Sequence, residues 1–183
     1  MPSTYIYRAF ACYANRRGKQ LVIRACATSD LARILHVINE AATAYRGVIP
    51  EDCYQDPYMP ADELLTESRE MTFFGWEESG KLAGVIGYQP IEGSVPAVTL
   101  VRHAYVSPGL QRRGVGSALL DHVVGLTTTP RLLVGTWVAA TWAIAFYEKH
   151  GFRLLPDGDQ LLRAYWRISE RQRETSVVLG REL

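Results

Sequence analysis

The sequence predicts a single domain of the α/β (α+β) class, with a mixed central sheet of about seven strands and helices on both faces. Apolar runs of strand length alternate along the chain with segments whose apolar residues recur at helical spacing. Glycine- and proline-containing breaks separate these segments. The expected order is β-α-(α)-β-β-β-α-β-α-β-β, in which residues 131–137 form a buried strand parallel to the strand before it. A length of 183 residues suits one domain with a sizeable core.

Composition and charge narrow the class of protein. Hydrophobic residues make up 48% of the chain and charged residues 21%, and the formal net charge of +1 gives no reason to expect nucleic acid or a membrane as partner. No apolar run reaches membrane-spanning length, and the N-terminus lacks the layout of a signal peptide. Three cysteines without a C-x-x-C pair favour reduced thiols in a cytoplasmic protein. Neither an HExxH pattern nor ligand spacing among the histidines indicates a metal site, so we expect none.

The first elements follow from local patterns. Residues 1–19 form either an extra edge strand, turning at Asn15-Arg16-Arg17-Gly18, or an extension, and the domain itself spans residues 20–183. A strand is expected from Gln20, followed by a helix capped by Thr28 or Ser29. Its predicted buried face consists of Leu31, Ile34, Leu35 and Ile38.

A long connection follows over residues 45–67. It holds three prolines, three tyrosines and several carboxylates, and a short helix is expected at 61–67. Long connections of this kind are more often functional than accidental. The segment either faces a substrate or packs on the core as a lid.

The rest of the chain is predicted in more regular steps. Strands are expected at 71–77 and 81–89, joined by a hairpin at Glu78-Ser79-Gly80, and at 97–106. A helix from Gly114 to near Gly125, the strand at 131–137 and a helix over 139–150 follow. A turn at 157–159 and two last strands, LLRAYWRI and ETSVVL, complete the expectation. A nucleic-acid patch would need the arginines of this segment on one face with aromatic residues between them, but the flanking strands indicate a hairpin, so a solvated turn is expected.

The stretch from Leu100 to Leu120 carries the clearest chemical signal. An apolar strand stops at Ser107-Pro108, a loop with two arginines follows, and Gly114-Val115-Gly116 opens a helix. The free N–H groups and the positive dipole end of a first helical turn attract anions, and glycines let a phosphate approach the backbone. The stretch therefore predicts a site for a phosphorylated ligand. The alternative is an ordinary strand–helix turn with surface arginines.

Two common nucleotide loops do not fit this stretch. A Rossmann fingerprint would need glycine at position 119, which is Leu, and a Walker loop would need Gly-Lys-Ser/Thr. The pattern V-x-P-x-x-Q-x-x-G-x-G is complete, and it resembles the acyl-CoA-binding motif of the GNAT (Gcn5-related) N-acetyltransferase family. A second stretch, AIAFYEKHGF at 143–152, is similar to the family's A-x-x-x-Y-x-x-x-G-F helix. The first motif consists of Val106, Pro108, Gln111, Gly114 and Gly116.

The resemblance covers roughly residues 20–180, nearly the whole chain, and implies the GNAT acyl-CoA N-acyltransferase fold, with acetyl-CoA as co-substrate. Tyr147 matches the tyrosine that sits beside the CoA sulfur and protonates the leaving thiolate as general acid. The alternative is a tyrosine packed at the helix–sheet interface. A backbone N–H near Val106 would polarise the acetyl carbonyl, and the acetyl group would pass directly to an amine. The cofactor-binding residues implied are Tyr105, Val106, Gln111, Arg112, Arg113, Gly114, Val115, Gly116, Ser117, Ala140 and Phe146.

Two positions depart from the family's pattern. Ala140 stands where many members carry an Asn that touches the pantetheine arm, and Leu100 stands where some members place a Glu general base. The base is therefore unassigned. His103, acting through a water, is one candidate, and Glu51 or Asp52 is another. His103 as an ordinary sheet histidine, and a reaction without a general base, are the alternatives.

The resemblance thus implies an N-acetyltransferase that moves the acetyl group of acetyl-CoA to an amine of a small molecule or peptide. The acidic and aromatic residues of 45–67 would suit a cationic acceptor. Trp137 and Trp142 either line the acceptor cleft or serve packing. The rival hypothesis is a non-enzymatic acyl-CoA-binding or regulatory module of the same fold. Expected partners are acetyl-CoA and the amine, without nucleic acid or membrane, and the oligomeric state, a homodimer included, stays open.

Overall fold

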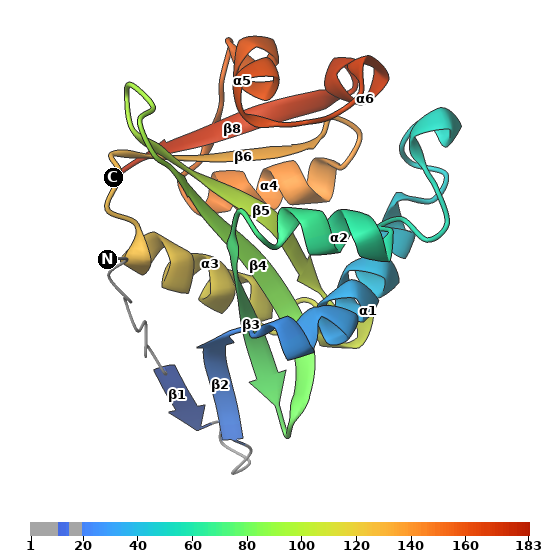
Figure 1. Cartoon of the computed structure of the whole chain (residues 1–183), viewed down its shortest axis with the longest axis vertical. Helices are drawn as coiled ribbons and strands as arrows, with labels where there is room; N and C mark the ends of the chain where they lie inside the picture. The colour runs from blue at the N-terminus through green and yellow to red at the C-terminus, as the bar shows by residue number, and fades with distance from the viewer. Residues whose placement is uncertain (1–10, 15–19) are drawn as a thin grey trace.

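A computed structural model describes residues 11–14 and 20–183, which form one eight-stranded sheet flanked by helices (Figure 1). The strand order across the sheet is β1-β2-β3-β4-β5-β6-β8-β7. This confirms the mixed sheet with helices on both faces. The strands are β1 (Ala11–Ala14), β2 (Gln20–Ala25), β3 (Thr72–Glu78), β4 (Lys81–Ile91), β5 (Val98–Val106), β6 (Arg131–Trp137), β7 (Arg153–Leu154) and β8 (Ser176–Glu182).

The pairing of β5 with β6 is parallel, whereas each other neighbouring pair is antiparallel. The predicted parallel step is therefore confirmed. Within the described residues, β5 and β6 are paired only from Val98 with Arg131 to Val101 with Val134. Beyond this point β5 continues to Val106 beside β4, and β6 continues to Trp137 beside β8. The two central strands therefore separate at their carboxyl ends and leave a gap in the middle of the sheet.

Helices cover the two faces of this sheet. The strands supply alternate residues to each face, as Val85 packs with α1 and α2 while its neighbour Ile86 packs with α3 and α4. Helix α5 lies on the same face as α1 and α2, because its Leu162 packs against Leu100 and Leu133 of the sheet. The helices are α1 (Leu31–Ala42), α2 (Ala61–Glu67), α3 (Val115–Leu126), α4 (Thr141–Lys149), α5 (Gly158–Tyr165) and α6 (Glu170–Glu174).

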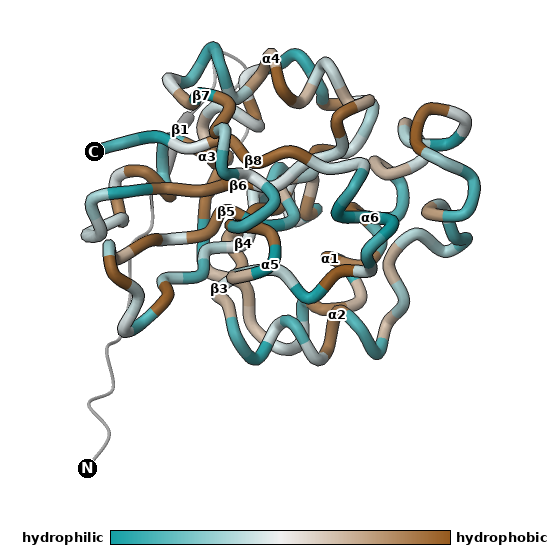
Figure 2. The backbone as a smooth tube through the Cα atoms, turned by 90° about the horizontal axis from the view of Figure 1, so that it is seen from above, coloured by the Kyte–Doolittle hydropathy of each residue, from teal (hydrophilic) through white to brown (hydrophobic). Residues whose placement is uncertain are grey.

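The core lies along the middle strands. In Figure 2, β5, β6 and β8 are largely brown, and α6 is largely teal. Leu100, Leu132 and Leu133 are fully buried between the two helical layers. Burying a side chain of this size contributes about 1.5–3 kcal/mol relative to an exposed one, so these three leucines contribute strongly to stability.

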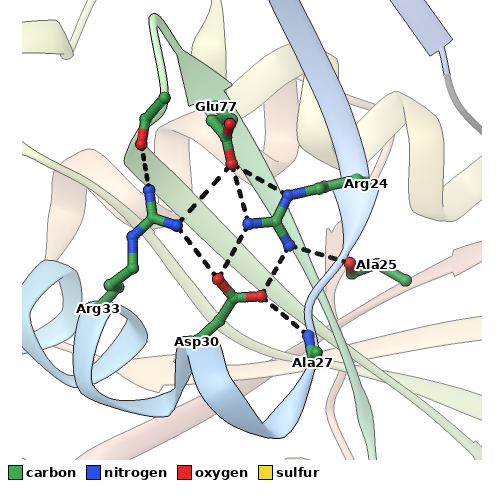
Figure 3. Close-up of polar contacts among 7 residues, drawn as sticks. Arg24, Ala25, Ala27, Asp30, Arg33 and Glu77 are labelled. Atoms are coloured by element: carbon green, nitrogen blue, oxygen red, sulfur yellow. Dashed lines mark hydrogen bonds and ion pairs between the residues drawn. The ribbon is translucent and has the colours of Figure 1, made fainter.

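The start of α1 differs from the predicted cap. Thr28 and Ser29 lie in a short 3-10 turn (Thr28–Asp30), and the side-chain acceptor is Asp30, which receives the backbone N–H of Ala27 at 2.9 Å. Asp30 also binds Arg24 of β2, which in turn binds Glu77 of β3 (Figure 3). The prediction of Thr28 or Ser29 as the cap is wrong. The Asp30 carboxylate takes this role because it can accept hydrogen bonds from the backbone N–H of Ala27 and from the Arg24 side chain at the same time.

The C-terminal segment also differs from the prediction. The stretch expected as the strand LLRAYWRI forms most of α5, and the expected turn at 157–159 is the start of that helix. The solvated turn between the last strands is helix α6, capped by the Ser169 hydroxyl, which accepts the N–H of Gln172. A short run of apolar residues does not distinguish a strand from a buried helix stripe. The last predicted strand is confirmed as β8, which pairs with β6 along one edge and with the short strand β7 along the other.

Candidate active site

A β-bulge in β5 decides which side chains face the gap in the sheet. Val85 of β4 pairs with Tyr105 and Gly87 pairs with Arg102, so Ile86 alone lies opposite His103 and Ala104. His103 has φ 46°, in the left-handed region that side chains other than glycine rarely adopt. The extra residue reverses the alternation of the strand. Arg102 and His103, although consecutive, therefore both reach Glu67 on the α2 side of the sheet.

A cavity of about 200 Å³ opens on this side of the sheet, at the gap between β5 and β6. Its floor includes Val101 and Gly135, which lie at the point where the two strands part. One wall comes from the 45–67 connection, and the other comes from the segment between α5 and β8, including Trp166 and Gln172. The connection thus lines the cavity and also packs on the core, through Ile49 and Met59.

Aromatic side chains form one wall of this cavity. Tyr58 accepts a hydrogen bond from the indole N–H of Trp137 at 2.9 Å, and the Tyr45 ring packs edge-on against the Tyr105 ring with centroids 6.4 Å apart. The Tyr45 and Tyr58 rings lie 5.4 Å apart, and Tyr45 stacks on Trp142 at 5.9 Å. Trp137 therefore lines the cavity, while Trp142, about half exposed, supports it from outside. Burial raises the pKa of Tyr45 to about 12, so this wall is uncharged at neutral pH.

Two carboxylates of α2, Glu63 and Glu67, face the cavity and differ in whether they are paired with a basic side chain. The Glu67 carboxylate is hydrogen-bonded to Nε2 of His103 and lies 3.6 Å from Arg102. Among the described residues, Glu63 has no arginine, lysine or histidine within ion-pair distance. Partial burial, reinforced by the charge of Glu67, raises the pKa of Glu63. The cavity therefore offers one carboxylate that is already paired and one that is available to a cation.

On the opposite face of the sheet, the loop after β5 has the geometry of an anion site. Gln111 donates its side-chain N–H to the carbonyl of Val106 at 3.1 Å, and Arg112 and Gly114 adopt left-handed φ values of 58° and 85°. The first hydrogen bond of α3 runs from the N–H of Ala118 to the carbonyl of Gly114. The N–H groups of the preceding turn therefore have no helical acceptor. Arg112 and Arg113 are exposed beside them.

The start of α3 is packed against α4. A Cβ atom at Gly116 would lie 3.5 Å from the Phe146 ring, in ordinary van der Waals contact, so the two helices approach each other closely at this position. Phe146 also packs edge-on against Tyr147 at 5.2 Å. Ala140, at the start of α4, is fully buried and carries no polar side chain that could replace the family's Asn. The predicted cofactor residues on α3 and α4 thus lie side by side, whereas the Tyr105 side chain faces the aromatic wall and leaves only its backbone toward the loop.

Tyr147 lies on α4 with 6% of its surface exposed, between Phe146 and Phe152. Burial, followed by the proximity of Tyr45, raises the pKa of Tyr147 well above its ordinary value. Its hydroxyl therefore keeps its proton throughout the physiological range. A group in this state can donate a proton to a leaving atom and cannot act as a base at neutral pH.

The other predicted base candidates lie elsewhere. Asp52 forms an exposed ion pair with Arg171 at 3.0 Å, and Glu51 is exposed on the same short turn. Leu100 is fully buried against Leu133 and Leu162. Of the candidates named from the sequence, His103 is the one that lines the cavity.

The sequence analysis expected acidic and aromatic residues of 45–67, Tyr58 among them, to suit a cationic acceptor, but it missed the partner of His103 and the part of the wall that Trp166 contributes. Glu67, Glu63, Tyr58 and Trp166 line the cavity, but none of them belongs to a recognisable motif. The spacing of Glu63 and Glu67, four residues apart on one short helix, was the available signal, because it puts both carboxylates on one helix face.

Comparison with known proteins decides the family. The model of the Acetyltransferase (GNAT) family matches residues 34–152, which include both motifs and the bulged strand. The chain belongs to the GNAT acetyltransferase family. The peptidyl-lysine N-acetyltransferase YiaC of Escherichia coli K12 is 29% identical over 135 residues, covering 73% of this chain and 84% of that protein.

Solved structures of GNAT proteins share the fold. The chain superimposes on an acetyltransferase of the GNAT family from Staphylococcus aureus Mu50 with a TM-score of 0.68 at 16% identity, covering 89% of this chain and 99% of that one. The PaiA N-acetyltransferase of Thermoplasma acidophilum, solved with coenzyme A, gives a TM-score of 0.64 at 18% identity, with 89% and 99% covered. In this GNAT chain, no helix of the described part is long and apolar enough to cross a membrane.

Proposed function

We propose that this GNAT protein transfers the acetyl group of acetyl-CoA to the side-chain amine of lysine in a peptide or protein. The observation that carries the proposal is the pairing of two sites across one gap in the sheet. The anion-binding start of α3 lies on one face, and a cavity with aromatic walls and carboxylates lies on the other. The similarity to a peptidyl-lysine N-acetyltransferase supports the choice of acceptor.

The α3 start fits the diphosphate of CoA. It offers free backbone N–H groups, the positive end of a 12-residue helix and two exposed arginines. Gly114 is exposed, and a side chain there would project into open space in front of these groups. The thioester would then reach the gap between β5 and β6, where the backbone near Val106 can donate to its carbonyl oxygen.

The reaction needs a proton taken from nitrogen and a proton given to sulfur. The bound ammonium first loses one proton to solvent, and the neutral nitrogen then attacks the acetyl carbon. His103 lies in the acceptor cavity and accepts the second proton from this nitrogen as the new carbon–nitrogen bond forms. Tyr147 donates its hydroxyl proton to the sulfur as the carbon–sulfur bond breaks. The products are an acetylated amine and CoA with a free thiol, and exchange with solvent returns both side chains to their starting states.

The acceptor cavity suits a lysine side chain. Its aromatic wall can cover the four methylene groups, and aromatic faces also attract ammonium groups. Glu63 is available to the cation at the cavity wall. A neutral acceptor would leave this carboxylate without a partner.

The test is acetylation of a lysine peptide. The protein is incubated with acetyl-CoA and a peptide with one lysine and a blocked N-terminus, with an arginine-substituted peptide as control. Polyamines, aminoglycosides and free amino acids complete the panel. We expect release of CoA and a mass increase of one acetyl group on the lysine peptide alone. Acetylation of a small amine instead would overturn the acceptor. Tight acetyl-CoA binding without turnover on any amine would favour the non-enzymatic binding module.

A further inference from the structure

Glu67, the last residue of α2, holds the ring of His103 from a distant part of the chain. One carboxylate oxygen, Oε2, is hydrogen-bonded to Nε2 of His103, and the other, Oε1, lies 3.6 Å from the guanidinium of Arg102. Arg102 donates in turn to the side-chain oxygen of Gln89 at 3.1 Å. The carboxylate therefore has a fixed partner on each side.

The histidine ring is held by more than this hydrogen bond. The bulge fixes its backbone at positive φ, and the ring of Phe73 packs beside it with centroids 5.8 Å apart. The His103 side chain is only 14% exposed. A non-glycine residue at positive φ costs roughly 1–3 kcal/mol, and such residues cluster at functional sites.

We propose that Glu67 is a positioning residue for His103. By accepting a hydrogen bond from Nε2–H, Glu67 selects the tautomer in which Nδ1 carries the free electron pair, because neutral imidazole donates from one nitrogen and accepts at the other. Its negative charge then stabilises the imidazolium that forms when Nδ1 takes the acceptor's proton. This second step rests on the proposed function, whereas the selection of the tautomer does not.

The charges around the pair agree with this role. Burial acts to raise the pKa of Glu67, but the hydrogen bond with His103 and the charges of His103, Arg102 and Arg167 lower it overall. Glu67 therefore remains an ionised acceptor at neutral pH. Glu63 within the same helix and Glu70 just after its end supply matched controls for the NMR experiment: Glu63 lines the same cavity, and Glu70 binds Arg167 at 2.9 Å.

The first test reads the tautomer directly. Nitrogen-15 NMR of histidine-labelled protein at mildly alkaline pH, with His103 assigned from the His103→Asn variant, distinguishes the two neutral forms. We expect the Nε2–H form in the wild type, in Glu63→Gln and in Glu70→Gln, and a mixture of both forms in Glu67→Ala. An unchanged tautomer in Glu67→Ala would overturn the proposal.

The second test separates positioning from direct catalysis. Glu67→Ala is expected to lower kcat about 10- to 100-fold with KM for acetyl-CoA unchanged, and Glu67→Gln, which keeps an acceptor oxygen, is expected to lose less. Because Glu67 acts through His103, the double variant Glu67→Ala/His103→Ala should be no slower than His103→Ala. An equal loss in both backgrounds would refute the positioning role.

The two proposals fail in different ways. If no amine is acetylated, or if His103→Ala is fully active, the proposed chemistry fails while the NMR experiment still decides what Glu67 does to His103. Circular dichroism and thermal unfolding of each variant identify any that does not fold, and Glu67→Gln then replaces Glu67→Ala in the kinetic comparison.

Discussion

The indole N–H of Trp137 donates a hydrogen bond to the hydroxyl of Tyr58 at 2.9 Å, across 79 residues of sequence. Trp137 ends β6 at the gap in the sheet, and Tyr58 belongs to the connection that forms a wall of the cavity proposed for the acceptor. This bond therefore fixes the wall to the sheet at the place where the acetyl group would be transferred.

Replacing Tyr58 by Phe removes the acceptor of that bond. Trp137 is 5% exposed, so its N–H loses its partner in a site with little water, and we expect unfolding in urea to show a loss of about 1–2 kcal/mol. Trp137→Phe removes the donor instead. The double variant should lose less than the sum of the two single losses, and strict additivity would show that the bond does not couple the segments.

Replacing Tyr147 by Phe tests the general acid. The phenyl ring keeps the packing against Phe146 and Phe152, so we expect the Kd for acetyl-CoA to stay nearly constant while kcat falls about 100-fold. Isothermal titration and CoA release measure the two quantities. Tyr54→Phe, outside the cavity lining, is the control. Unchanged turnover in Tyr147→Phe would mean that another group protonates the sulfur.

Replacing Gly114 by Leu tests the diphosphate site. We expect the Kd for acetyl-CoA to rise roughly tenfold or more, because the side chain occupies the space in front of the free N–H groups. Gly93→Leu is a matched control, since Gly93 has a φ of 75° against 85° at Gly114 and both have open space around the missing side chain. Both variants carry the same backbone strain, so equal acetyl-CoA affinities would refute the assignment of the loop.

Replacing Glu63 by Gln tests recognition of the cationic acceptor. The side chain keeps its size and loses its charge, and we expect KM for the lysine peptide to rise roughly 3- to 10-fold with KM for acetyl-CoA unchanged. Asp62→Asn, one residue earlier on the exposed surface of α2, should change neither constant. An equal response to both substitutions would indicate a long-range effect of charge and no contact with the acceptor.

Replacing Asp30 by Asn tests the anchor of α1. The hydrogen bonds from Arg24, opposed by burial and reinforced by the N–H of Ala27, lower the pKa of Asp30 from 3.8 to about 2. A depressed pKa in the folded state contributes stability above the unfolded value and loses it as the pH falls. We therefore expect Asp30→Asn to cost about 2 kcal/mol at neutral pH, with the difference from the wild type shrinking between about pH 4 and pH 2.

Urea unfolding at several pH values measures this difference. Asp62→Asn is again the control and should leave the unfolding free energy unchanged. A difference between wild type and Asp30→Asn that is constant over this range would show that the carboxylate charge does not stabilise the fold.

The sequence by itself determined the elements whose physics is local. The strand–loop–helix at residues 98–126 follows from an apolar run, a proline and two glycines, and an anion site at a helix start needs only that contiguous stretch. The helix with Tyr147 and the hairpin at Glu78-Ser79-Gly80 were predictable for the same reason. The family resemblance rests on these contiguous motifs as well.

Only the tertiary structure decided which side chains line the cavity proposed for the acceptor. Successive side chains of a strand point to opposite faces of the sheet, and a bulge reverses this alternation. The face to which His103 points therefore depends on a bulge that arises from the pairing of β5 with β4. Glu67 and Tyr58 reach the cavity from a connection 36 or more residues away from their partners, and short apolar runs such as LLRAY become helix or strand according to what they pack against. Contacts of this kind depend on the register of the sheet and on which edges are already paired, and no local pattern encodes either.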